Sequence, residues 1–198
     1  MPSIVDHFEI LGMERQLDFS SETLRRHYDE RCQEAHPDAG GTTSDFDAVT
    51  EAHKCLASPS RRLRHWLELS GFAVVEDGSL PPAVEERFEK ISTLLRVAGE
   101  IAERHREARS TLVRSVAEAE GIALQPQVAE ARGELENSIA EIVSGFRQLD
   151  EGDPEESREK AVEAARCLSF LEKWEAQLRA AWALSLIHIS EPTRPERI

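Results

Sequence analysis

The sequence contains 198 residues, of which 40% are hydrophobic and 31% are charged, and its formal net charge is −14. This length and hydrophobic content suffice for a folded core and exclude a fully disordered polymer. The acidic balance argues against proteins that bind nucleic acid or an anionic membrane, because such contacts need lysine and arginine.

The sequence carries no membrane or secretion signal that we recognise. No apolar run approaches the roughly 20 residues of a membrane span, and the stretch MPSIVDHFEI lacks the basic start and apolar core of a signal peptide. We therefore expect a cytoplasmic protein. The three cysteines, Cys32, Cys55 and Cys167, are far apart, which favours buried free thiols over disulfides or a zinc site. We expect no metal and no cofactor.

Almost every segment follows a helical pattern, so the predicted fold class is all-α. A first helix is predicted over about residues 4–12, where Gly12 ends it. A second helix is predicted from a cap at Ser20 or Ser21 to Ala35, because the residue before Pro37 avoids helical angles.

The third predicted helix begins at Thr42, and Asp45 three residues later completes a capping box. Its apolar face consists of Phe46, Val49, Ala52 and Leu56. Pro59 ends or redirects this helix, and a short helix follows over about residues 60–69.

After a Gly- and Pro-punctuated linker, the spacing of apolar residues changes to a heptad pattern. The first such stretch is Val84, Phe88, Ile91, Leu95, Ala98, Ala102, His105 and Arg109. A break is predicted at EGIALQPQ, residues 120–127, because of its glycine and proline. The next helix has its seam at Val128, Ala131, Leu135, Ile139, Ile142, Phe146 and Leu149.

The last helix is predicted to start with Asp153 as its cap and Pro154 at its first position. Its apolar face is Ala161, Ala164, Leu168, Leu171, Trp174 and Leu178. Three amphipathic helices with short breaks predict an antiparallel three-helix bundle. The heptad seams can close within one chain or between two chains.

These patterns predict four segments along the chain: a small helical unit at 1–70, a linker at 71–82, the bundle at 83–183, and a tail at 184–198. The stretch LSLIHISEPTR at 184–194 resembles a translated transposase adapter from sequencing-library preparation. We therefore expect the tail to be non-native and leave it out of functional reasoning.

The tripeptide His36-Pro37-Asp38 lies between two predicted helices, and its neighbours carry a wider pattern. That pattern consists of DHFEILGM, LRRHYDERCQEAHPD and FDAVTEAHKCLASPSRR. Over about residues 5–65 the chain resembles the J-domain of DnaJ co-chaperones. The resemblance implies an N-terminal J-domain, an antiparallel helix pair joined by the HPD loop.

The J-domain resemblance implies binding to a DnaK-type (heat-shock-70) chaperone and stimulation of its ATPase, with no bond chemistry by the chain itself. The chain is thus not expected to be an enzyme. The residues implied in chaperone binding are His36, Pro37, Asp38, Arg25, Arg26 and His27. Pro37 restricts the loop backbone, and Asp38 offers a carboxylate suited to an arginine of the partner.

A J-domain followed by a three-helix unit resembles the HscB family, which delivers the iron–sulfur scaffold IscU to the chaperone HscA. The stretch AVEAARCLSFLEKWEAQL, residues 161–178, resembles the last helix of that family. The resemblance implies client binding by the bundle, and the candidate residues are Phe170, Phe88 and Leu95. The cluster itself need not be held by this chain.

Two alternatives stay open. One is a J-domain adaptor whose coiled-coil bundle recruits the chaperone to a client outside iron–sulfur assembly. The other is a degenerate J-like structural protein that engages no chaperone. Asp29, Glu30 and Glu34 favour the latter, because they stand where the family often has lysine or arginine.

Overall fold

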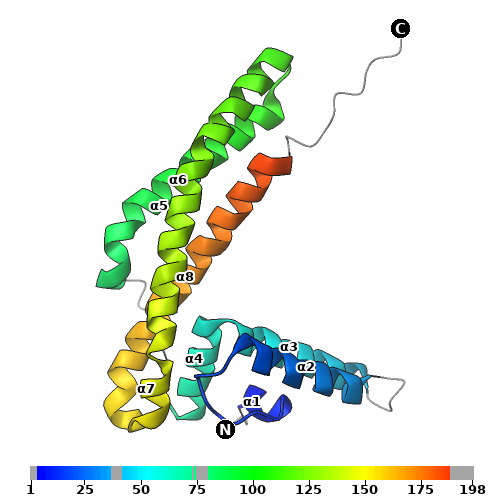
Figure 1. Ribbon diagram of the computed structural model, residues 1–198, viewed down its shortest axis with the longest axis vertical. Helices are drawn as coiled ribbons and strands as arrows, with labels where there is room; N and C mark the ends of the chain where they lie inside the picture. Colours follow the sequence, from blue (N-terminus) through cyan, green and yellow to red (C-terminus); the bar gives the residue numbers. More distant parts are fainter. Residues whose placement is uncertain (1–3, 37–41, 73, 75–79, 188–198) are drawn as a thin grey trace. The chain divides into compact units, whose positions relative to one another are not determined.

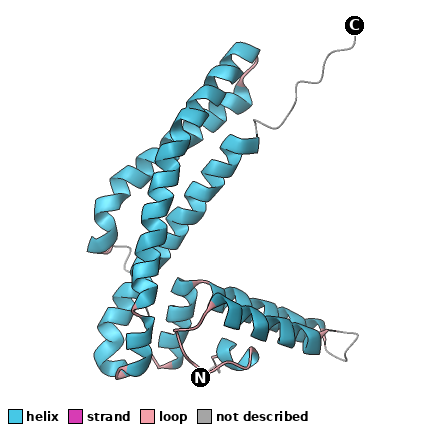
Figure 2. Cartoon of the chain, viewed as in Figure 1, coloured by secondary structure: helices cyan, strands magenta, loops and turns pink. Residues whose placement is uncertain are grey.

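The computed structural model describes residues 4–36, 42–72, 74 and 80–187 (Figure 1). Within these residues every regular element is a helix, which confirms the all-α prediction (Figure 2). The helices are α1 His7–Ile10, α2 Ser21–Ala35, α3 Thr43–Ala57, α4 Pro59–Leu69, α5 Pro82–Glu107, α6 Thr111–Ser144, α7 Phe146–Glu151 and α8 Pro154–Ile187.

The chain divides into two compact units. Unit 1 consists of Met1–Pro81 and Ala140–Ser169, and unit 2 consists of Pro82–Ile139 and Phe170–Ile198. The last part of α6, the whole of α7 and the first half of α8 thus belong with the N-terminal helices. The boundaries expected between the N-terminal unit, the linker and the bundle, at residues 70 and 83, rest on glycine and proline positions in the sequence and stay a prediction.

The first helix of unit 1 is shorter than the predicted 4–12. It begins after Asp6, whose carboxylate accepts hydrogen bonds from the backbone N–H groups of Phe8 and Glu9 at 2.9 and 3.3 Å. Gly12 ends the segment as predicted, with φ of 65°. This backbone angle favours glycine, whereas the Arg31 guanidinium that a Cβ would meet at 2.7 Å is the end of a flexible side chain that can move aside.

The α2–α3 pair forms as the sequence predicts. The Ser20 hydroxyl caps α2 by accepting from the N–H of Thr23 at 3.0 Å. Thr42 and Asp45 form the expected capping box at the start of α3. The two helices lie side by side and antiparallel (Figure 1). Their shared core with α1 is Phe8, Leu11, Leu24, Ala35, Val49, Ala52 and Leu56. Phe46, predicted on this face, is 37% exposed.

A buried arginine of α4 and a carboxylate of α7 hold the segment before α2 from two sides. Arg62 is buried; its guanidinium donates to the Leu17 carbonyl at 2.9 Å and lies 4.2 Å from the Phe19 ring centroid. Asp150 accepts from the backbone N–H groups of Leu17 at 2.8 and 2.9 Å and of Asp18 at 2.8 Å. Through these bonds residues 140–169 join the N-terminal helices in unit 1.

A second polar cluster of unit 1 ties α1 to α4. The Nε2 atom of buried His65 accepts the backbone N–H of His7 at 3.0 Å and lies 3.9 Å from the Asp6 carboxylate. The two imidazole rings are 4.6 Å apart, and Arg15 donates to Asp6 at 2.6 Å. Burial lowers the pKa of both histidines, so the folded cluster favours neutral rings.

In unit 2, α5 and α6 run antiparallel. Lys90 donates to Glu134 at 2.8 Å near the start of α5, and the pair His105–Glu118 at 3.2 Å marks its end. The part of α8 in this unit also runs antiparallel to α6, and Arg132 donates to Glu175 at 3.0 Å. The buried apolar residues are Val84, Ile91, Leu94, Ala117, Val128, Ala131, Leu135, Leu171, Trp174 and Leu178.

The predicted break at 120–127 is wrong. The chain turns at residues 108–110, and α6 continues through Gly121 with Pro126 inside the helix. Pro126 removes one backbone N–H, but Ala117, Val128 and Ala131 on both sides of it are buried, and this packing outweighs the local cost. A second break, at Gly145, separates α6 from α7 where one helix was predicted to continue to Leu149.

We predict that Asp150→Ala lowers the free energy of unfolding by about 2–3 kcal/mol, because two backbone N–H groups lose a charged acceptor. Urea denaturation followed by circular dichroism measures the change. Glu151→Ala is the matched control: Glu151 pairs with Arg147 on the surface, and we expect a change below about 0.5 kcal/mol. Equal effects of the two substitutions would contradict the role given to Asp150.

We also predict that the melting temperature falls as the pH is lowered from 7 to 5. The pKa of both His7 and His65 is lowered in the folded chain from the ordinary 6.5. The unfolded chain therefore binds protons first, and stability is lost as the pH falls below that value. His65→Gln, which keeps a hydrogen-bond acceptor but does not titrate, should make the melting temperature depend less steeply on pH. His53→Gln should not, because His53 stacks on Tyr28 outside this cluster.

Candidate functional site

The first candidate surface is the connection between α2 and α3. His36 follows the last residue of α2; it is exposed, and its backbone is extended, with φ of −65° and ψ of 137°. A residue before proline avoids helical angles, so Pro37 explains where α2 ends. Pro37 and Asp38 lie outside the described residues. The described chain resumes at Thr42, which caps α3.

The predicted basic surface of α2 is present but partly neutralised. Arg25 and Arg26 are exposed. The Nε of Arg25 lies 3.7 Å from the Asp29 carboxylate one turn later, and both side chains are largely in solvent. Arg31 pairs with Glu34 at 2.8 Å. Exposed pairs of this kind are weak, so a stronger acidic partner surface can displace them.

His27, the third predicted contact on α2, is half buried. Its Nδ1 lies 3.1 Å from the Leu11 carbonyl, and this contact requires the Nδ1–H tautomer because a carbonyl only accepts. His27 thus fixes the end of α1 against α2. Its role in chaperone binding stays a prediction, and nothing in the sequence signalled this structural contact.

The second candidate surface is an aromatic cluster in unit 2. The ring of Phe88 lies 6.2 Å from the ring of Trp174, and the ring of Phe170 lies 6.1 Å from it. Trp174 is buried, Phe170 is half buried, and Phe88 is 47% exposed. The structure therefore brings two of the three predicted client-binding residues together around a tryptophan that the sequence assigned to the core. Aromatic residues grouped in this way are typical of protein-binding sites.

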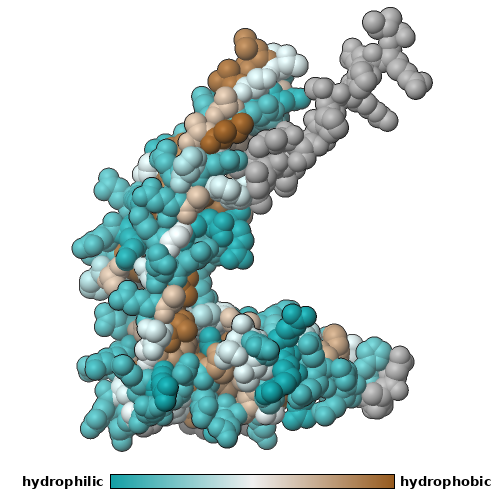
Figure 3. All heavy atoms as spheres, viewed as in Figure 1, coloured by the Kyte–Doolittle hydropathy of each residue, from teal (hydrophilic) through white to brown (hydrophobic). Residues whose placement is uncertain are grey.

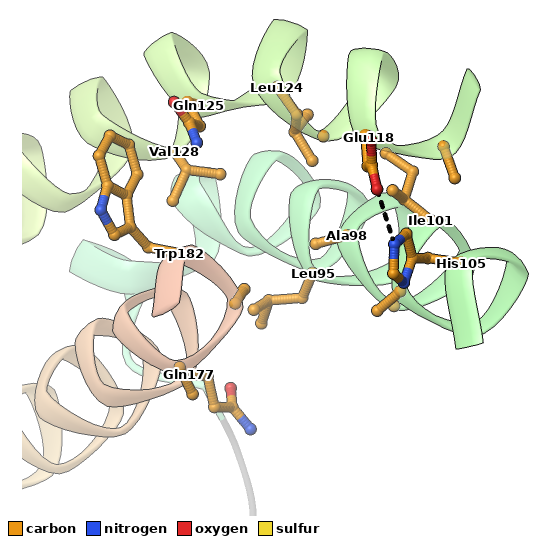
Figure 4. Close-up of a pocket in the computed structure, with 16 residues that line it drawn as sticks. Leu95, Ala98, Ile101, His105, Glu118, Leu124, Gln125, Val128, Gln177 and Trp182 are labelled. Atoms are coloured by element: carbon orange, nitrogen blue, oxygen red, sulfur yellow. Dashed lines mark hydrogen bonds and ion pairs between the residues drawn. The ribbon is translucent and has the colours of Figure 1, made fainter. Parts of the chain in front are cut away.

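Leu95 lies in a different place. It is half buried and lines an apolar cavity of about 300 Å³ with Ala98, Ile101 and Leu124 (Figure 4). The Nε2 atom of His105 and a carboxylate oxygen of Glu118, 3.2 Å apart, lie on its wall. Sequence reasoning missed this cavity because its residues follow the heptad pattern of a filled core.

The signal that could have revealed the cavity is the size of the side chains. Gly99, Ala102 and Gly121 line it together with Ala180 and Ala181. Glycine and alanine at facing seam positions leave space that leucine or isoleucine would fill. The cavity can accept an apolar group, but its lining brings no nucleophile together with a base.

The two buried cysteines outside these surfaces lie in environments that disfavour the reactive thiolate. Burial raises the pKa of the Cys55 thiol to about 11, and burial also raises the pKa of Cys167. Neither thiol is therefore an activated nucleophile. Within the described ranges no group of three or more His, Cys, Asp or Glu side chains is arranged to bind a metal ion. Nor does any helix in them have the length and hydropathy needed to cross a bilayer.

No protein-family model matches the chain, and no curated protein matches it. Among solved structures, the chain is similar to the human co-chaperone protein HscB, with 20% sequence identity and a TM-score of 0.42. The match covers 91% of this chain and 83% of the human one.

Proposed function

We propose that the chain is a J-domain co-chaperone that stimulates the ATPase of a DnaK/HscA-type chaperone through the loop containing His36, Pro37 and Asp38. One observation carries the proposal: the loop is bounded on both sides by fixed helix ends. The core shared by α1, α2 and α3 holds the two helices antiparallel, and exposed His36 stands at the point where α2 ends. The tripeptide thus connects two packed helices.

A loop held between two packed helices is suited to docking on another protein. Because the helices are already packed, less conformational entropy is lost on docking. The carboxylate of Asp38 is an acceptor suited to an arginine of the partner. Arg25 and Arg26 on α2 are exposed, and their charge suits an acidic partner surface. In this role the chain acts in the cytoplasm, binds no cofactor and is not an enzyme.

We predict that His36→Gln or Asp38→Asn reduces stimulation of the chaperone ATPase at least tenfold, because each removes a group that the partner would contact. Steady-state ATP hydrolysis by the cognate DnaK-type chaperone, with and without the full chain, measures the effect. Gln33→Ala is the matched control, since Gln33 is exposed on the same helix. If wild type and His36→Gln stimulate equally, the tripeptide is not the stimulating site, and if neither stimulates, the chain is the degenerate J-like protein that the acidic residues of α2 favour.

We further propose that the chain delivers an IscU-type iron–sulfur scaffold, bound at the aromatic cluster of Phe88, Phe170 and Trp174. The support is the partial exposure of the two phenylalanines whose rings both lie near the ring of a buried tryptophan. Half-exposed aromatic rings supported by a buried neighbour provide contact area at low entropic cost. Leu95 lines the neighbouring cavity of unit 2 and belongs to this proposal only as a secondary contact.

We predict that Phe170→Ala and Phe88→Ala each weaken binding of an IscU-type scaffold at least fivefold, measured by isothermal titration calorimetry with the full chain. Phe46→Ala is the control, because Phe46 is a partly exposed phenylalanine of unit 1. Absence of binding by the wild-type chain, with ATPase stimulation intact, would favour the adaptor that serves a different client.

A further inference from the structure

The outer side of α6 carries an apolar stripe. We define the outer stripe as Leu112, Val116, Ala119, Ile122, Ala123 and Pro126. Leu112 is 73% exposed, Val116 is 48% exposed and Ile122 is 51% exposed, and the other three members are exposed as well. In Figure 3, brown spheres gather toward the end of the α5–α6 hairpin.

The stripe is not the face that α6 uses inside unit 2. The inner seam of the helix consists of Ala117, Gly121, Leu124 and Val128; Ala117 and Val128 are buried, and all four line the cavity. α6 is therefore apolar on two sides over its N-terminal half. A helix that is apolar all round is normally buried on all sides, whereas no part of the chain that the structure describes covers this outer side.

The spacing of the stripe is that of a helix–helix contact. Leu112, Val116, Ala119, Ala123 and Pro126 alternate four and three residues apart, the spacing of a and d positions. The stripe covers about 21 Å of helix at 1.5 Å per residue. It contains no charged residue, although 31% of the chain is charged. A contiguous exposed stripe of this kind marks a protein-binding surface.

The charges at the two ends of the stripe identify its partner. Arg109 is exposed just before α6, and Glu130 is exposed just beyond Pro126. A second copy of the stripe placed antiparallel, with Ala119 opposite itself, brings Arg109 of each chain beside Glu130 of the other. A parallel copy would place arginine against arginine. An anionic membrane would be repelled by Glu130, whereas a second chain offers Arg109 to it.

We propose that the outer stripe of α6 is a homodimer interface, in which two chains pair antiparallel around Ala119. The contact is isologous, so the same patch serves on both chains. Ala119 and Ala123 allow the helices to approach closely at the centre, and Leu112 packs against Pro126 of the other chain. Because the contact is one helix face, the dimer is a concentration-dependent assembly rather than an obligate one.

Sedimentation velocity of the full chain, from low to high micromolar concentration, tests the interface. Val116→Asp should raise the dissociation constant of the dimer at least tenfold, because it buries a carboxylate in an apolar contact. Val116 is exposed in the single chain, so circular dichroism should show an unchanged fold. Thr93→Asp, an exposed position on α5, is the matched control and should leave the dimer intact.

Two further variants test the antiparallel arrangement. Arg109→Glu should weaken the dimer, and adding Glu130→Arg should restore it. In a Cys32→Ala background, Ala119→Cys should form a disulfide-linked dimer under mild oxidation, whereas exposed Glu103→Cys on α5 should not. A mixture of Ser115→Cys and Ala123→Cys chains should form the mixed dimer faster than either chain alone.

Several results would overturn the proposal. A monomer over the whole concentration range excludes the dimer, and a dimer that Val116→Asp does not weaken uses another surface. Equal cross-linking rates at residues 103 and 119 exclude the contact at Ala119. Flotation of a monomeric chain with vesicles containing phosphatidylserine, lost in Val116→Asp, would assign the stripe to a membrane instead.

Discussion

The backbone N–H and the backbone carbonyl of Leu17 each form a hydrogen bond with a charged side chain. These two bonds fix how the segment before α2 packs in unit 1. Arg62 of α4 donates to the Leu17 carbonyl, and the carboxylate of Asp150 in α7 accepts from the Leu17 N–H. Three residues later Ser20 caps α2, so the direction in which α2 begins is set by groups that are distant in the sequence. A buried charge such as Arg62 is costly unless hydrogen bonds compensate it, and the Leu17 carbonyl supplies one of these bonds. The segment is therefore held in one conformation, and α2 presents His36 from a fixed helix.

The proposed chaperone surface combines this fixed scaffold with weak electrostatics. Arg25 and Arg31 already have acidic neighbours on α2, Asp29 and Glu34, in exposed pairs. Breaking such a pair costs little, yet it reduces the attraction that an acidic partner exerts from a distance. We therefore expect the specificity of docking to come from the shape and chemistry of the loop, with a slower encounter than a uniformly basic helix would give.

Local sequence signals predicted the helix ends of this fold well, because caps depend on neighbouring residues. Ser20 and Thr42 cap helices as expected, and Asp153 accepts from the N–H groups that follow it. Two helix ends were still wrong, since α1 is shorter than expected and a break falls at Gly145, and the other errors concern long-range packing. Pro126 was interpreted as a break, but the buried residues around it keep α6 continuous. His27 contacts Leu11 across 16 residues, and no local pattern predicts such a contact. The same distinction applies to the candidate surfaces. The loop is marked by a local tripeptide, whereas the aromatic cluster forms around Trp174, which the sequence assigned only to the core.

The proline that misled the sequence reasoning also bears on the dimer. A proline at 126 has no N–H to donate to the carbonyl of Ile122, and this carbonyl belongs to a residue of the outer stripe. In water the carbonyl is solvated, but in an apolar contact it would need a donor. In the proposed antiparallel register Ser115 of the other chain falls opposite Ala123, one residue from Ile122, and a serine hydroxyl is a suitable donor. A parallel pairing in register would set Ser115 opposite itself and away from Ile122, so the need for a donor at this carbonyl favours the antiparallel arrangement.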